Sequence, residues 1–218
     1  MRPNERSPFN GSILGMATTD ARPAAVLIAG PPASGKSTVA ASLARTLGAT
    51  LVDQDVATGP LISIIGSLVN VNDIDDPRLA KLTRAARYET ITCLGEDNLR
   101  AGRTVLLVAP FTEERKNLHA WEELSHRLRQ AGAVTVTMVW LYLSREELLH
   151  RMRARGAGRD TGKLRGEQRF IDQLHLGPPV GPHIPIHAVG SVDQLVHRTV
   201  LQLRADFSLP SSGLGDIA

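Results

Sequence analysis

Short, continuous apolar runs alternate along the chain with segments in which apolar residues recur at helical spacing. The runs predict strands that are buried on both faces, at residues 24–29, 50–52, 104–109, 134–143 and about 184–189. The segments between them predict helices at residues 36–47, 60–68, 77–100, 113–130 and 191–203, with one more that starts at Ser144. Strands that alternate with helices are typical of a parallel sheet with right-handed crossovers, so the pattern predicts an α/β fold. Ligands bind such sheets at the carboxyl ends of the strands, which makes those ends the expected place for functional residues.

The patterned part of the chain is expected to form one domain. The 218 residues are enough for one sizeable core. Residues 1–22 are rich in Pro, Gly, Ser and Thr and lack periodicity, so we interpret them as a flexible lead-in. The domain is expected to cover residues 23–207, and residues 208–218 are expected to form a flexible tail.

The amino-acid composition is typical of a globular protein and argues against nucleic-acid and membrane partners. Hydrophobic residues make up 42% and charged residues 22% of the chain, as in globular domains. The formal charge of +3 is too small to indicate nucleic-acid binding, so nucleic acid is not the expected partner. The single cysteine, Cys93, permits no disulfide within the chain, and no apolar run is long enough to span a bilayer. These features predict a cytoplasmic protein without membrane contact, either a monomer or a homodimer.

The first predicted strand leads into a glycine-rich loop, Gly30-Pro31-Pro32-Ala33-Ser34-Gly35-Lys36-Ser37, followed by Thr38. The loop fits the pattern G-x-x-x-x-G-K-[ST], with a strand before it and a helix after it, as the motif requires. Glycine lets the backbone curl so that successive N–H groups point at phosphate oxygens, and the following helix adds its positive end. We expect Lys36 to reach the β- and γ-phosphates and the Ser37 hydroxyl to ligate Mg²⁺. The loop therefore predicts binding of ATP and Mg²⁺.

Two aspartates, Asp53 and Asp55, follow the second predicted strand. In an extended stretch, residues i and i+2 point the same way, so both carboxylates are expected to face the cleft. Phosphoryl transfer needs one group that deprotonates the attacking hydroxyl and another that helps to hold the metal. We assign Asp53 to the metal and to the base, and Asp55 to the substrate hydroxyl, although the sequence leaves open which of the two is the base. The competing interpretation is that Asp55 only caps the next helix.

Arginines and glycines gather after the helix that starts at Ser144. Arg151 and Arg155 are four residues apart and share one helix face, and Arg159 follows among glycines that allow movement. A solvated basic face and a patch that binds RNA or DNA are the two competing interpretations.

The glycine-rich loop, the Asp53-Gln54-Asp55 sequence and the arginine segment together resemble the shikimate/gluconate kinase-like group of P-loop kinases, which is related to the chloramphenicol phosphotransferases and zeta-toxin-type kinases. The resemblance covers about residues 24–203. It implies a P-loop NTPase fold of three layers, α/β/α, with a five-stranded parallel sheet in the order 2-3-1-4-5.

The same resemblance implies a mobile lid at about residues 155–169 that closes over ATP. In such a lid, Arg155 is expected to stack on the adenine and Arg159 to reach the phosphates, while Arg151 does either. After the last predicted strand, Val189 is expected to pass the adenine.

The chain departs from many P-loop NTPases at the end of the third predicted strand, where Pro110 and Phe111 stand in place of an aspartate. The departure shifts metal binding to Ser37 and Asp53 and argues against a motor or switch ATPase. Pro110 and Phe111 are expected to line the substrate side, or else to form a strand-terminating turn with a buried aromatic ring.

A basic stripe on the predicted helix at residues 77–100 is a candidate for substrate binding. Arg78, Lys81, Arg84 and Arg87 recur every third residue. Arg84 and Arg87 are the expected contacts to an acidic or phosphorylated substrate, although such a stripe is more often simply solvated.

These features predict an ATP-dependent kinase whose acceptor is a hydroxyl of a small molecule, such as a sugar, an acid or an antibiotic-like metabolite. The basic lid and stripe motivate a second hypothesis, a kinase of nucleosides, nucleotides or polynucleotide ends. A third hypothesis is a regulator that binds ATP without transferring phosphate. The sequence does not identify the acceptor.

Overall fold

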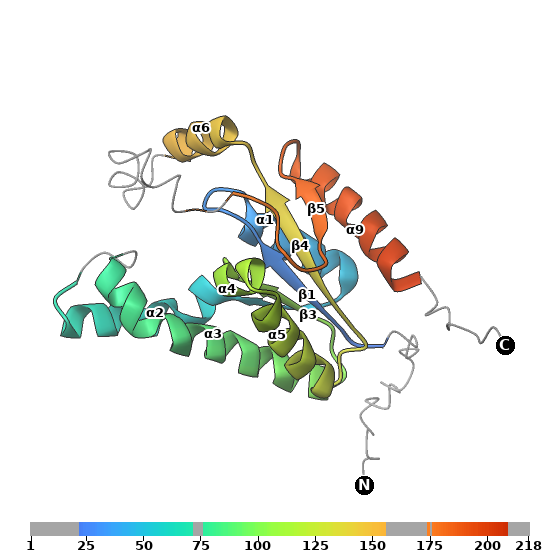
Figure 1. The fold of residues 1–218 in the computed structure, drawn as a ribbon, viewed down its shortest axis with the longest axis horizontal. Helices are drawn as coiled ribbons and strands as arrows, with labels where there is room; N and C mark the ends of the chain where they lie inside the picture. The colour runs from blue at the N-terminus through green and yellow to red at the C-terminus, as the bar shows by residue number, and fades with distance from the viewer. Residues whose placement is uncertain (1–21, 72–75, 156–173, 175, 209–218) are drawn as a thin grey trace, which may run out of the picture.

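The computed structural model describes residues 22–71, 76–155, 174 and 176–208, and a five-stranded parallel sheet forms its centre (Figure 1). The strands are β1 (Ala24–Ala29), β2 (Thr50–Asp53), β3 (Val105–Val108), β4 (Thr135–Tyr142) and β5 (Ile184–His187). They lie in the order β2-β3-β1-β4-β5, which confirms the predicted order. All of β1 pairs with β4, from Ala24 opposite Thr135 to Ala29 opposite Trp140. The carboxyl end of this central strand opens directly into the glycine-rich loop.

Helices cover both faces of the sheet, because successive side chains of a buried strand point to opposite faces. The described helices are α1 (Lys36–Leu47), α2 (Gln54–Leu68), α3 (Pro77–Arg100), α4 (Thr112–Lys116), α5 (Leu118–Gln130), α6 (Arg145–Arg155) and α9 (Val192–Ser208). Val26 and Ile28 of β1 belong to the core shared with α1, α6 and α9, whereas Leu27 belongs to the core shared with α3 and α5. The predicted three-layer α/β/α architecture is therefore confirmed.

Helix α2 begins at Gln54, not at Pro60 as predicted. The Asp53 carboxylate accepts hydrogen bonds from the backbone N–H groups of Asp55 (2.9 Å) and Val56 (3.4 Å), which starts the helix directly after β2. The capping residue is therefore Asp53, and the competing interpretation of Asp55 as the cap is wrong.

The helix predicted at residues 113–130 is two helices, α4 and α5. At Asn117 the backbone is extended, with φ −126° and ψ 113°. The Asn117 side chain accepts a hydrogen bond from the N–H of His119 (3.0 Å) and caps α5. Apolar periodicity alone did not reveal this cap.

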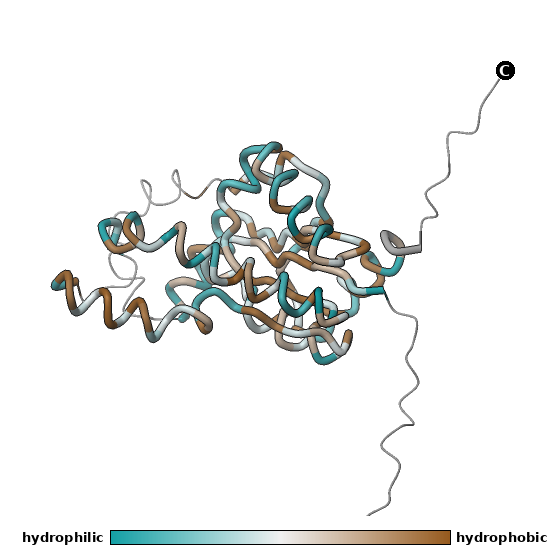
Figure 2. The backbone as a smooth tube through the Cα atoms, turned by 90° about the horizontal axis from the view of Figure 1, so that it is seen from below, coloured by the Kyte–Doolittle hydropathy of each residue, from teal (hydrophilic) through white to brown (hydrophobic). Residues whose placement is uncertain are grey.

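Helices α2 and α3 form a hairpin that extends beyond the sheet (Figure 1). The hairpin has a small core of its own, made by Ile62, Val71 and Leu79, against which Ile65 packs. Figure 2 shows that much of α2 is hydrophobic, although several of its large side chains are exposed. Among the residues that the structure describes, no helix combines the length and the apolar character needed to cross a membrane.

Candidate active site

The glycine-rich loop curls between β1 and α1 because two of its residues have left-handed backbone conformations. Ala33 has φ 58° and Gly35 has φ 86°. No side chain fits at Gly30, since an added Cβ would lie 2.7 Å from both the Leu141 carbonyl oxygen and Ser34 Oγ. The backbone therefore forms a concave nest at the N-terminus of α1, which is the geometry that binds phosphate.

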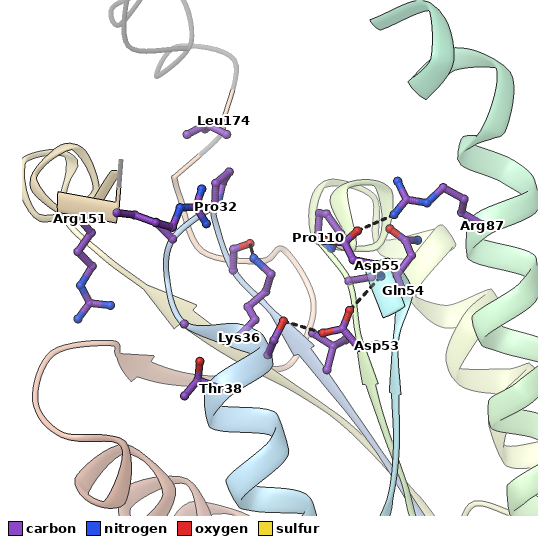
Figure 3. Close-up of a pocket in the computed structure, with 17 residues that line it drawn as sticks. Pro32, Lys36, Thr38, Asp53, Gln54, Asp55, Arg87, Pro110, Arg151 and Leu174 are labelled. Carbon is purple, nitrogen blue, oxygen red and sulfur yellow. Dashed lines mark hydrogen bonds and ion pairs between the residues drawn. The ribbon is translucent and has the colours of Figure 1, made fainter. Parts of the chain in front are cut away.

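Lys36 points back into this loop (Figure 3). Its Nζ donates hydrogen bonds to the carbonyl oxygens of Gly30 (2.9 Å) and Pro31 (2.8 Å). Burial lowers the pKa of Lys36 to about 8, although the nearby carboxylates of Asp55 and Asp53 raise it. An ammonium group that has lost solvent is stabilised by an anion placed beside it, so the loop is suited to a phosphate group.

The loop and its surroundings fit a magnesium–ATP complex. Ser34 Oγ is buried and has no hydrogen-bond partner among the described residues, which leaves a donor and acceptor for a ligand or a water molecule. Ser37 and Asp53 offer a hydroxyl and a carboxylate, the oxygen ligands that Mg²⁺ prefers beside phosphate oxygens.

Asp53, at the end of β2, links the loop to α2. It is 7% exposed, and its Oδ2 accepts a hydrogen bond from Ser37 Oγ (2.6 Å) while its Oδ1 caps α2. Asp55 does not continue the extended strand as predicted, because it lies in the first turn of α2. Both aspartates nevertheless line the same cavity.

An ion pair between α2 and α3 lies across the cavity from the loop (Figure 3). Arg87 Nη2 donates to Asp55 Oδ1 (2.5 Å), and Arg87 Nε donates to Thr58 Oγ1 (2.9 Å). The Asp55 side chain is 65% exposed, so solvent screens the pair and its contribution to stability is about 1 kcal/mol or less. The two opposite charges are therefore able to rearrange around a ligand.

One cavity of about 600 Å³ joins these groups, a volume typical of small-molecule sites. Most of the residues predicted for the site line it: Gly30, Pro32, Ala33, Gly35, Lys36, Ser37, Thr38, Asp53, Asp55, Arg87, Pro110, Arg151 and Arg155. Arg151 also donates a hydrogen bond to the carbonyl of Ala188, which ties α6 to the segment after β5. Arg159 and the predicted lid beyond Arg155 lie outside the described residues.

Comparison with known proteins assigns the chain to a family. A family model described as AAA domain matches residues 26–175, a range that contains all of the cavity wall. The chain belongs to this AAA domain family. No curated protein matches its sequence.

The AAA domain also shares its fold with solved structures of small-molecule kinases. A gluconokinase from Sinorhizobium meliloti is 18% identical and has a TM-score of 0.52, with 85% of this chain and 95% of that chain covered. The APS kinase of Mycobacterium tuberculosis is 19% identical and has a TM-score of 0.51, with 84% and 98% covered. A shikimate kinase from Aquifex aeolicus is 17% identical and has a TM-score of 0.50, with 84% and 98% covered. The similarity confirms the predicted kinase-like P-loop fold.

Five of the described residues predicted for the site do not line the cavity of the AAA domain. Two of them, Pro31 and Ser34, are buried within the glycine-rich loop, and the other three lie elsewhere. Phe111 is 1% exposed, and its ring packs edge-on against Tyr88 with 6.0 Å between the ring centroids. The prediction that Phe111 lines the substrate side is therefore wrong, and the alternative of a buried aromatic ring after the strand is correct. Arg84 is exposed on α3 outside the cavity wall, and Val189 is 42% exposed after β5, also outside it.

Sequence reasoning missed Gln54 in the AAA domain. Gln54 is 5% exposed and lines the cavity, and its Nε2 has no hydrogen-bond partner among the described residues. The only signal in the sequence is its place between two aspartates. A buried donor of this kind is suited to an acceptor atom of a ligand.

Sequence reasoning also missed Arg115 of α4, a buried arginine whose charge acts on Lys36. Arg115 is 6% exposed, its guanidinium carbon lies 3.6 Å from the centroid of the Trp140 ring, and it donates to the carbonyl of Gly177 (3.2 Å). Burial lowers the pKa of Arg115 to about 10, and its charge in turn lowers the pKa of Lys36. In the sequence Arg115 resembles any solvated helix arginine, so no pattern reveals it.

Proposed function

We propose that the chain is an ATP:alcohol phosphotransferase, which transfers the γ-phosphoryl group of ATP to a hydroxyl of a small molecule. The observation that carries the proposal is one cavity with two different walls. The phosphate loop with Lys36 forms one wall, and Asp55 with Arg87 forms the other. The fold shared with gluconate and APS kinases supports the same class of reaction.

On the nucleotide side, the N–H groups of the loop and the Lys36 ammonium bind the phosphates. When bound, Mg²⁺ neutralises phosphate charge, and Ser37 and Asp53 are the residues that would hold it. Arg151 and Arg155 add positive charge to the same wall of the cavity.

We assign the role of base to Asp55 rather than to Asp53. Both oxygens of Asp53 already accept hydrogen bonds, from Ser37 and from the N-terminus of α2. Asp55 meets Arg87 through Oδ1 and is largely exposed, so its Oδ2 is accessible to an incoming hydroxyl. The hydroxyl gives its proton to Asp55 as its oxygen bonds to the γ-phosphorus, and the bond from that phosphorus to the bridging oxygen of ADP breaks.

The wall around Asp55 favours a polar acceptor. Gln54 Nε2 needs an acceptor atom, and the guanidinium of Arg87 supplies further N–H donors. Pro110 adds a small apolar surface beside them. This wall suits a molecule with several hydroxyl or carboxylate oxygens, such as a sugar, a sugar acid or a hydroxylated antibiotic.

The test is ADP release in the presence of a panel of sugars, acids, nucleosides and hydroxylated antibiotics. We expect ADP to form at an acceptor-dependent rate with at least one of them, and Lys36→Ala to abolish that rate. Calorimetry with ATP and Mg²⁺ is run in parallel. Absence of nucleotide binding would refute the site itself, whereas binding without acceptor-dependent ADP release would favour a non-catalytic ATP-binding regulator.

A further inference from the structure

The α2–α3 hairpin exposes an apolar face that the proposed reaction does not use. On α2, Leu61, Ile64 and Leu68 are 63%, 58% and 76% exposed. Leu82 of α3 and Val56 of α2, at 63% and 78%, add to the exposed apolar surface of the hairpin. Single exposed apolar residues are common, but a contiguous group on one element indicates a surface that binds something.

The exposed residues of α2 follow the spacing of a helix–helix contact. Leu61, Ile64 and Leu68 are exposed, and the half-buried Ala57 precedes them by one turn. The four residues are separated by four, three and four positions, so they form one stripe along the helix. A neighbouring stripe faces the interior and consists of the buried residues Gln54, Thr58, Ile62 and Gly66. The outward stripe, with Leu61, Ile64 and Leu68, is therefore more apolar than the stripe that α2 already buries.

The absence of charge on the outward stripe of α2 favours its contact with an identical stripe, whereas the charged residues Arg78 and Lys81 lie on α3. Residues 56–72 contain no Asp, Glu, Lys, Arg or His. In a symmetric interface each surface meets a copy of itself, so any excess of one charge would repel its counterpart. An uncharged stripe avoids this repulsion.

We propose that a second copy of this chain covers the stripe, with the two α2 helices packed antiparallel about a twofold axis. An axis midway between residues 61 and 64 places Leu61 of one copy against Ile64 of the other. The same register places the small Ala57 opposite the large Leu68, which allows the helices to approach closely. Each positive helix N-terminus then lies near the negative C-terminus of the other copy.

Two features of the hairpin agree with this arrangement. A hollow of about 560 Å³ at its tip is lined by Val69, Val71 and Leu82 together with Arg78 and Lys81. The proposed register brings the first turn of α2 of the other copy level with Val69, at the end of the hairpin where this hollow lies. Because the hairpin extends beyond the sheet (Figure 1), two copies can pair along it with their sheets at opposite ends.

The surface is large enough for a dimer of modest affinity. At about 100 Å² of apolar surface for a large aliphatic side chain, the exposed groups of the hairpin offer roughly 400 Å² per copy. Homodimer interfaces are about 65% apolar, so the whole contact is about 600 Å² per copy, at the lower end of specific interfaces. We therefore expect dissociation in the micromolar range.

The first experiment follows the association of the full chain by sedimentation velocity at protein concentrations from about 1 to 200 μM, which span the expected dissociation constant. We expect a monomer–dimer equilibrium that Leu61→Glu weakens by on the order of 100-fold or more, because a symmetric interface contains the substitution twice. Leu201→Glu is the matched control: Leu201, on α9, is 52% exposed and should leave the equilibrium unchanged. Loss of dimer in both variants, or in neither, would overturn the proposal.

The second experiment tests the register. Leu61→Glu and Ile64→Lys should each be monomeric alone, and a mixture of the two should form a heterodimer because the new charges face each other. Failure of the mixture to associate would refute the antiparallel register. A wild-type chain that stays monomeric at every concentration would overturn the proposal, and co-sedimentation of that monomer with phosphatidylserine vesicles would assign the face to a membrane surface instead.

Discussion

The two walls of the cavity are built in different ways: the proposed nucleotide wall consists of the glycine-rich phosphate loop with Lys36, and the proposed acceptor wall of Asp55 with Arg87. The phosphate loop lies between β1, which is buried along its whole length, and α1, whose Val39 and Leu43 pack into a large core. The end of the α2–α3 hairpin that extends beyond the sheet has only the small cluster of Ile62, Val71 and Leu79, although the rest of α3 packs into the core on one face of the sheet. The phosphate loop is therefore held on both sides by large cores, whereas Asp55 and Arg87 lie where the hairpin leaves the core, close to its weakly packed outer part. Substitutions in the acceptor wall are expected to change specificity at little cost in stability.

Asp53 is the residue at which the two walls meet. One of its oxygens holds the Ser37 hydroxyl on the nucleotide side, and the other caps the helix that carries the acceptor side. A change at Asp53 is therefore expected to affect both walls, whereas changes at Lys36 or Arg87 should each affect one.

The largest expected effect is that of Lys36→Ala on the nucleotide wall. Removal of the cation that neutralises the transferring phosphoryl group should lower kcat by about 10³-fold or more. Stability should change little, by about 1 kcal/mol or 2–4 °C in Tm, because the folded protein already desolvates this charge. Steady-state kinetics and thermal unfolding measure the two effects, with the exposed Lys116→Ala as control. Near-normal turnover by Lys36→Ala would contradict the proposed site.

Two substitutions of Asp53 should separate its roles. Asp53→Asn keeps an acceptor for the N-terminus of α2 but removes the charge, so we expect turnover to fall by on the order of 10²-fold with stability retained. Asp53→Ala also removes the cap and should cost about 1 kcal/mol in addition. Chemical denaturation measures this difference. Equal stability of the two variants would show that the cap contributes nothing.

The difference between the walls also explains which parts of the fold and the site could be predicted from the sequence. The loop from Gly30 to Ser37 is a linear motif, so residue types at fixed spacing determine its geometry. The buried strand β1 and helices α1 and α3 begin and end where the apolar pattern predicts. These elements lie in the well-packed part of the domain, where local preference and tertiary packing agree.

The acceptor wall could be predicted only in part. Arg84 and Arg87 are equivalent in the basic stripe, and only contacts from α2, at Asp55 and Thr58, distinguish Arg87. Phe111 follows the third strand at the place where a site residue is expected, yet Tyr88 of α3 holds it in the core. Contacts between residues far apart in the sequence decide which side chains line the site. The spacing of residues along the chain does not predict these contacts.

Arg87→Met tests whether the two walls act independently, because it changes the acceptor wall alone. Loss of hydrogen bonds from a charged group is expected to raise the KM for the acceptor by about 10- to 100-fold. The KM for ATP should stay within about twofold, since Arg87 lies across the cavity from the loop. Arg84→Met is the matched control and should change neither constant. An equal loss in both KM values would show that the two walls are not independent.

The smallest expected effect is the pH dependence of nucleotide binding, which reports on the charge of Lys36 in the nucleotide wall. Burial lowers the pKa of Lys36 to about 8 in the free protein, and bound phosphates favour its charged form. The free protein therefore loses this proton as pH rises through 8, while the complex keeps it. Affinity for ATP should fall by about tenfold between pH 7 and pH 9, with uptake of nearly one proton per ATP bound at pH 9. Calorimetry in buffers of different ionisation enthalpy measures that uptake. Lys36→Arg, whose guanidinium stays charged, should bind with no such slope; a slope that persists in this variant would place the titrating group elsewhere.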